Sequence, residues 1–197
     1  MFYSRLVAIW FLFAAMILVS CDSKTALNSS DEKKLDTLWN EDVQNSFFGI
    51  SFGASQGEAK ESLKRNRLLV QEINDNCIQC FPVMSDQISY GGISWEYFFA
   101  HFCNGKLYMV VFQSAFSEKE EAIEQYTYAR KQMSAKYKVM DVPLRDSTEI
   151  ARSGIYSKTS RKAGIVCDAG YSDNHVFYYY TELVYVDKEY DKTTEQL

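Results

Sequence analysis

The residues of this chain best suited to chemistry are cysteines and a histidine. Cys77 and Cys80 form a C-x-x-C pair, and His101 and Cys103 follow with one residue between them. Tetrahedral Zn²⁺ accepts such a set, because thiolate and imidazole are its usual ligands, but the second pair lacks the usual turn-borne spacing. A redox-active pair is also disfavoured, because no helix N-terminus follows Cys80 to lower a thiolate pKa. We therefore predict no metal site and no cofactor.

A serine motif offers a second chemistry. Gly49-Ile-Ser-Phe-Gly53 matches the G-x-S-x-G nucleophile elbow, and acidic residues and His175 follow in the order that a hydrolase uses. An elbow serine, however, follows several strands of a parallel sheet, and hardly any folded chain precedes Ser51. An alternating strand with Ser51 facing outward explains the motif equally well. A small envelope hydrolase is thus the least favoured function, and we predict no catalytic residue.

The N-terminal segment has the pattern of an export signal. Arg5 is the only charged residue before Asp22, and residues 6–19 carry no polar side chain. As a helix this run would span about 21 Å, short of the bilayer core of about 30 Å. A positive start, a short apolar run and a small residue at its end are typical of a secretory signal peptide.

The end of this run, Leu18-Val19-Ser20-Cys21, resembles the lipobox of bacterial lipoproteins. The resemblance implies a signal peptide over residues 1–20 and acylation of Cys21, with palmitate among the attached chains. Two or three acyl chains anchor a protein durably, because each buried CH₂ contributes about 0.8 kcal/mol. We therefore expect a membrane-anchored lipoprotein of the bacterial cell envelope, with the outer membrane favoured. The alternatives are an ordinary secretory signal and a short uncleaved anchor.

Composition excludes several other classes. The chain of 197 residues is 47% hydrophobic and 15% aromatic, which excludes disorder and allows a packed core. Its net charge is −5, and no stretch is strongly basic, so we expect no nucleic-acid partner. Anionic lipid would repel an acidic domain, so the acyl chains must provide the anchoring.

Export also determines the expected state of the remaining cysteines. With Cys21 acylated, an even number remains in an oxidising compartment, where disulfides form. Four cysteines allow three connectivities. A bridge between Cys77 and Cys80 would close a very short ring. We therefore favour Cys103 paired with one of these two and Cys167 paired with the other.

The elements that position these residues fall into three parts. We predict an acylated cysteine and polar tether over residues 21–46, a charged tail over 188–197, and between them an α+β domain over 47–187. This domain is either a single unit or two small halves, because each half runs from a capped helix to a hairpin.

Two helices and several hairpins define the expected fold. Ser55 and Glu58, and again Ser117 and Glu120, have the capping-box spacing that opens a helix. The first helix should end near Arg65 and the second near residue 138. The second helix should bury one stripe of side chains: Ala122, Tyr126, Ala129, Met133 and Tyr137. We expect a loop over residues 75–85, which contain Cys77, Cys80 and Pro82. We predict an α+β fold, an antiparallel sheet built from hairpins with two or three helices packed mainly on one face.

The first of these capped helices carries a second resemblance. Phe52-Gly-Ala-Ser-Gln-Gly-Glu-Ala-Lys-Glu-Ser-Leu63 and the order of elements around it are similar to small envelope modules of the BamE (SmpA) and beta-lactamase-inhibitor-protein type. The resemblance covers a minor part of the chain. It implies a role in protein binding or assembly and no catalysis.

The clearest hairpin centres on Asn104-Gly105, which fits a two-residue type I′ turn. This turn places Cys103 opposite Lys106 and His101 opposite Tyr108. One face of the hairpin is then apolar core. The other face would carry side chains that are mostly aromatic: Tyr97, Phe99, His101, Tyr108 and Phe112.

We predict that these positions form a binding surface, continued by Tyr178 and Tyr180 of a second hairpin, for an envelope protein or glycan. The more ordinary interpretation is that the tyrosines fill a half-buried sheet face. The favoured function is a non-catalytic binding or assembly module. The alternative is a lipid-anchored inhibitor or immunity-like protein.

Overall fold

The computed structural model describes residues 39–83, 87–171 and 176–190. The predicted signal peptide, Cys21, most of the tether, His175 and most of the charged tail lie outside the described residues. Within the described ranges no helix is long and apolar enough to cross a membrane.

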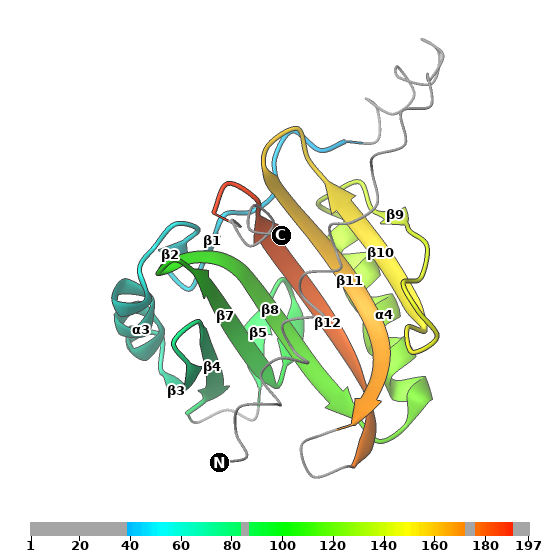
Figure 1. Ribbon diagram of the computed structural model, residues 1–197. Coiled ribbons are helices and arrows are strands. Elements are labelled where there is room, and N and C mark those ends of the chain that lie inside the picture. Colours follow the sequence, from blue (N-terminus) through cyan, green and yellow to red (C-terminus); the bar gives the residue numbers. More distant parts are fainter. Residues whose placement is uncertain (1–38, 84–86, 172–175, 191–197) are drawn as a thin grey trace.

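The fold is α+β, as predicted, and its centre is an antiparallel sheet of eight strands in the order β3-β4-β7-β8-β12-β11-β10-β9 (Figure 1). In chain order these strands are β3 (Leu68–Asn74), β4 (Cys77–Pro82), β7 (Tyr97–Cys103), β8 (Lys106–Phe116), β9 (Met140–Asp141), β10 (Ala151–Tyr156), β11 (Arg161–Tyr171) and β12 (Phe177–Asp187). Two small hairpins add β1 (Ser46–Phe47) with β2 (Ile50–Ser51), and β5 (Ile88–Tyr90) with β6 (Ile93–Trp95). The described helices are α3 (Gln56–Arg65) and α4 (Lys119–Ser134).

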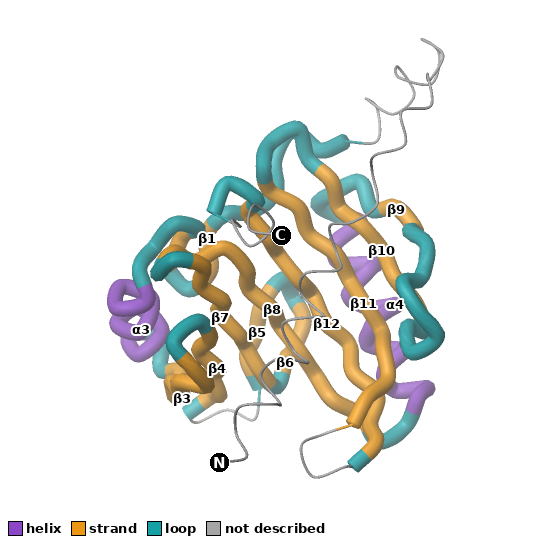
Figure 2. The backbone as a smooth tube through the Cα atoms, viewed as in Figure 1, coloured by secondary structure: helices purple, strands orange, loops and turns teal. Residues whose placement is uncertain are grey.

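One face of the sheet carries the main core. Helix α4 packs against β8, β10, β11 and β12, and Figure 2 shows it behind these strands together with the β5–β6 hairpin. Its buried residues are the first four of the predicted stripe: Ala122, Tyr126, Ala129 and Met133. The fifth, Tyr137, is also buried but lies beyond the end of the helix. A single core cluster reaches from Val43 to Tyr185, so it joins both halves of the domain.

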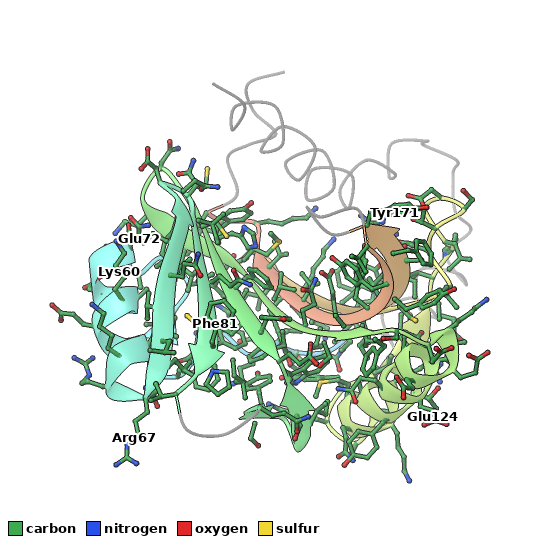
Figure 3. All side chains as sticks on the ribbon, turned by 90° about the horizontal axis from the view of Figure 1, so that it is seen from below. Lys60, Arg67, Glu72, Phe81, Glu124 and Tyr171 are labelled. Carbon is green, nitrogen blue, oxygen red and sulfur yellow. The ribbon has the colours of Figure 1, made fainter. Side chains whose placement is uncertain are left out.

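Helix α3 lies beside strand β3 at one edge of the sheet. Its capping box is present as predicted, because the Glu58 amide donates to Ser55 Oγ (3.3 Å) and Glu58 Oε2 accepts from the Ser55 amide (2.8 Å). Lys60 Nζ on the helix bonds Glu72 Oε2 on β3 at 2.7 Å (Figure 3). These contacts fix the strand-to-helix unit that begins at Gly53.

The second predicted capping box is not formed. The N-cap of α4 is Glu118, whose side chain makes no capping hydrogen bond, so Ser117 lies one residue too early. The helix also ends at Ser134, short of the predicted boundary.

The folded region starts earlier than predicted. Val43 is 2% exposed, and Asn40 bridges to Ser157 beyond the end of β10. The amide of Asn40 donates to Tyr156 O (2.9 Å), while Asn40 O accepts from the Lys158 amide (3.0 Å). Residues assigned to the tether therefore belong to the domain from Asn40 onward.

Candidate functional site

The two faces of the sheet are distinguished by strand β7. Successive side chains of a strand point to opposite faces. Phe98, Ala100 and Phe102 are buried in the main core, whereas the residues between them are only half-buried. The face that carries Tyr97, Phe99, His101 and Cys103 is called the second face below. Among the described helices, neither packs on it (Figure 1).

The pairing of β7 with β8 begins as predicted and then shifts. Asn104 and Gly105 both have positive φ, and Cys103 pairs with Lys106. His101, however, pairs with Met109, because Tyr108 is an extra residue that forms a β-bulge. Every later residue of β8 therefore faces opposite to the prediction.

Two residues that were predicted to lie on the open surface of the hairpin are buried. Phe112 is wholly buried in the main core, where its ring stacks on Tyr90 at a centroid distance of 4.0 Å. Tyr108 stays on the second face but is only 7% exposed. It belongs to a buried apolar cluster with Met109, Val111 and neighbours on β12. Neither ring is available to a partner in this structure.

The remaining predicted aromatics on β7 form a continuous row with one residue that the sequence did not identify. The ring of Phe81 on β4, labelled in Figure 3, lies next to β7, and its centroid is 5.7 Å from that of Tyr97. Tyr97 lies 6.2 Å from Phe99, and Phe99 lies 6.4 Å from His101. All four side chains are half-buried.

The row continues to the β3 edge without a charged residue. Leu69 pairs with Phe81 and is 55% exposed, and Ile73 on the same strand is 48% exposed. Register and alternation assign ten uncharged side chains to this part of the second face, which we call the uncharged patch: Leu69, Gln71, Asn74, Cys77, Gln79, Phe81, Tyr97, Phe99, His101 and Cys103. Ile73 is the extra residue of a β-bulge beside Asn74. Burial lowers the pKa of His101 to about 4, so His101 is neutral at physiological pH.

Polar residues occupy the next part of the second face, on β8, β12 and β11. Gln113 Nε2 donates to Glu182 Oε1 at 2.7 Å. Burial raises the pKa of Glu182 to about 7, and the nearby charge of Asp168 adds to this effect. The Gln113 hydrogen bond and Arg145 act in the opposite direction. We call Gln113, Glu182, Asp168 and Arg145 the polar cluster.

Tyr178 and Tyr180 lie on the second face beside the polar cluster, with ring centroids 5.8 Å apart. Tyr180 pairs with Asp168, and burial with nearby carboxylates raises the pKa of its hydroxyl well above the usual range. They are half-buried and share a face with Tyr97, as predicted, but Gln113 and Glu182 lie between the two groups.

The four cysteines of the domain are free thiols, and the predicted disulfides are not formed. Cys167 lies on β11, four strand spacings from β4, or about 19 Å, and a disulfide tolerates about 7 Å between Cα atoms. Cys80 faces the core, whereas Cys77 and Cys103 lie on the second face at diagonal positions of adjacent strands. Burial raises the pKa of Cys77 and Cys80 to about 12.

The same alternation separates the four zinc ligands that the sequence suggested as an alternative. Cys80 points away from Cys77, His101 and Cys103. Within the described ranges, no group of three histidine, cysteine or acidic side chains is arranged to hold a metal ion.

The serine motif also lacks the setting of a nucleophile elbow. Ser51 is exposed on β2, which pairs only with β1 among the described strands. It lines an open hollow of about 390 Å³ with Glu58, Glu61, Arg65 and Lys106. The lining contains no imidazole from the described residues, so the serine–histidine pair of a hydrolase elbow is not formed there.

Comparison with known proteins identifies no relative of this chain: no family model matches it, and no curated protein and no solved structure shows significant similarity. The lipobox and the similarity to small envelope modules stay predictions from the sequence.

Proposed function

We propose that this chain is a lipid-anchored protein of a bacterial cell envelope that binds a partner protein on the uncharged patch and catalyses no reaction. One observation carries the proposal. Phe81, Tyr97 and Phe99 form a half-buried aromatic row beside exposed apolar residues of the edge strand β3. The centres of protein interfaces are depleted in charged residues and enriched in aromatic ones.

The contrast between the two faces of β3 supports this interpretation. Leu68 on the core face is 8% exposed, whereas its neighbour Leu69 on the second face is 55% exposed. Scattered exposed apolar residues are ordinary, but contiguous apolar patches on a soluble surface mark interaction sites. Because 24% of the chain is charged, ten adjacent positions without a charge are a distinct surface.

The tether joins the domain far from the uncharged patch, so the anchor would leave the patch accessible. Asn40 is held by the β10–β11 turn and also by Lys138, whose amide donates to Asn40 Oδ1 at 2.8 Å. Arg161 forms a two-pronged ion pair with Asp42. This junction lies at β10, six strand spacings, or about 29 Å along the sheet, from β3. A chain anchored at Cys21 would thus offer the patch on the side away from its attachment.

The partner can be sought by photo-cross-linking in the cells that produce the protein. A photoreactive phenylalanine analogue at position 97 or 99 of the full lipoprotein should give a discrete protein adduct. The matched control is position 128, because Tyr128 is 46% exposed on α4, away from the patch. The adduct should disappear when Leu69→Lys places a charge in the patch.

An adduct that is absent at positions 97 and 99, or that forms equally at position 128, would contradict the proposal. Anchoring is measured separately. Cys21→Ala should abolish incorporation of labelled palmitate, and unchanged labelling would exclude Cys21 as the acylated residue.

A further inference from the structure

The β11–β12 hairpin extends past the rest of the sheet. Strand β8 pairs with β12 only as far as Phe116 opposite Tyr179, and β10 pairs with β11 only as far as Cys167. The last rung, Tyr171 opposite Phe177, therefore has no neighbouring described strand on either side. Figure 1 shows this end of the hairpin at the bottom of the sheet. It is a projecting two-stranded ribbon, which we call the ribbon tip.

The ribbon tip is aromatic and uncharged in its described part. Tyr171 is 70% exposed and Phe177 is 46% exposed, and their rings meet edge to face at 5.1 Å. Phe177 also meets Tyr179 at 5.2 Å, which gives three rings on one side of the ribbon. Residues 169–171 and 176–180 contain no charged side chain, and the one acidic residue between them in the sequence, Asp173, lies outside the described residues. Figure 3 places Tyr171 at the end of the sheet far from α3.

We infer that the ribbon tip inserts into the headgroup region of a lipid bilayer. Tyrosine and phenylalanine favour this boundary, since their rings leave water while the tyrosine hydroxyl stays hydrated. A protein partner is the weaker candidate. Tyr171 and Phe177 together expose about 230 Å², at about 200 Å² for a whole aromatic side chain, whereas a stable protein interface needs about 800 Å² on each side. Insertion into lipid requires no minimum area and no matching pocket.

The covalent chain allows this contact together with the proposed anchor. The domain is joined to its tether at Asn40, beside the β10–β11 turn, which is the opposite end of β11 from Tyr171. Strand β11 is about 35 Å long, whereas the extended chain from Cys21 to Asn40 can span about 65 Å. Acyl chains and ribbon tip can therefore reach the same membrane surface. The inference relies on the proposed anchor only to bring the bilayer near.

A photoreactive lipid tests the contact directly. The full lipoprotein is reconstituted into vesicles of phosphatidylethanolamine and phosphatidylglycerol that contain a phospholipid with a diazirine near its glycerol. After illumination, adducts are mapped by mass spectrometry. We expect lipid on the peptide between Lys162 and Lys188, which contains the ribbon tip, as well as on the N-terminal segment.

Substitution should remove only the first of these adducts. Tyr171→Ser with Phe177→Ser should lower its yield about tenfold, the factor that corresponds to about 1.4 kcal/mol. The control Tyr128→Ser replaces a ring elsewhere that is as exposed as Phe177 and should leave the yield unchanged. Mapping of the unsubstituted protein is informative even where a variant folds poorly.

Each distribution of adducts has one meaning for the inference. Adducts on the N-terminal segment alone would overturn the ribbon contact and leave the anchor standing. Adducts on the ribbon tip alone would support the ribbon contact and contradict the anchor. A yield that the double substitution does not change would also overturn the inference.

Discussion

Replacing Glu182 with glutamine should stabilise the protein at alkaline pH and leave it unchanged at acidic pH. Glu182 lies on the second face, where it accepts a hydrogen bond from Gln113. Burial, with the charge of Asp168, raises its pKa to about 7 from an ordinary value of 4.5. Glutamine has nearly the same shape, accepts the same hydrogen bond and carries no charge at any pH.

The size of the effect follows from linkage. Because the pKa is raised on folding, the folded state keeps a proton between pH 4.5 and about 7 that the unfolded state has already released. The free energy of unfolding therefore falls by about 1.4 kcal/mol per pH unit across this window, or about 3 kcal/mol in all. Residual solvent around the half-buried side chain screens part of this, so the figure is an upper bound.

His101 should flatten the pH dependence of the free energy of unfolding in the wild-type protein. Burial lowers its pKa from 6.5 to about 4, so between these values the unfolded state binds a proton that the folded state does not. Stability due to His101 is present above pH 6.5 and is lost as the pH falls toward 4. The slopes of His101 and Glu182 are opposite and cancel between pH 4.5 and 6.5. The Glu182→Gln variant should instead gain stability steadily as the pH rises through this range.

Urea unfolding of the chain from residue 22 onward, at a series of pH values from 4.5 to 8, measures both curves. The difference between variant and wild type should grow from near zero at the acid end to its full value above pH 7. Glu124→Gln, on the exposed side of α4, is the control and should change stability by a few tenths of a kcal/mol at most. A difference independent of pH, or a variant that is less stable at pH 8, would refute the assignment.

Two further predictions concern the helix cap and the thiols. Ser55→Ala removes the hydroxyl that accepts from the Glu58 amide and should lower the free energy of unfolding by about 1 kcal/mol. The change is measured from the midpoint of urea unfolding. An unchanged midpoint would show that the cap does not stabilise the protein. The four cysteines of the domain should all react with iodoacetamide after unfolding without reductant, and two protected cysteines would reveal a disulfide that the structure lacks.

The parts of the fold that local sequence determines were predicted well. Asn104-Gly105 gives its turn because both residues adopt the positive φ that a type I′ turn needs. Ser55 and Glu58 cap α3 because the capping box involves only a few adjacent residues. The stripe of α4 was identified because a one-sided helix has a clear period, and Tyr126 and Met133 are buried accordingly.

Strand β8 shows why the candidate site was predicted only in part. Its residues are apolar from Leu107 to Phe112 and buried on both faces, so alternation gives no indication of which side chain faces which way. The bulge at Tyr108 then reverses the faces, which moves Phe112 into the core. A bulge inside a uniformly apolar strand leaves no trace in the hydrophobic pattern.

Strand β4 was missed altogether, and with it Phe81. The segment over residues 75–85, which contains Cys77, Cys80 and Pro82, was predicted as a loop. In the structure Pro82 is the last residue of β4, where a missing amide hydrogen does little harm. The pairing of β4 with β7 is a long-range contact, and only that contact brings Phe81 to Tyr97.

Burial reduces the charge on the second face, which determines what kind of partner surface can bind there. His101 is neutral because its pKa is near 4, and Glu182, with a pKa of about 7, is only partly ionised at neutral pH. At neutral pH the second face therefore carries no charge on β3, β4 and β7. Lys106 adds one positive charge where β8 begins, opposite Cys103, and β12 adds only the partial charge of Glu182. Arg145 and Arg152, both on Glu149, lie toward the β10 edge. A partner seated on the uncharged patch would therefore meet apolar and aromatic contacts first, and only a footprint that extends across β12 would make binding depend on pH near neutrality.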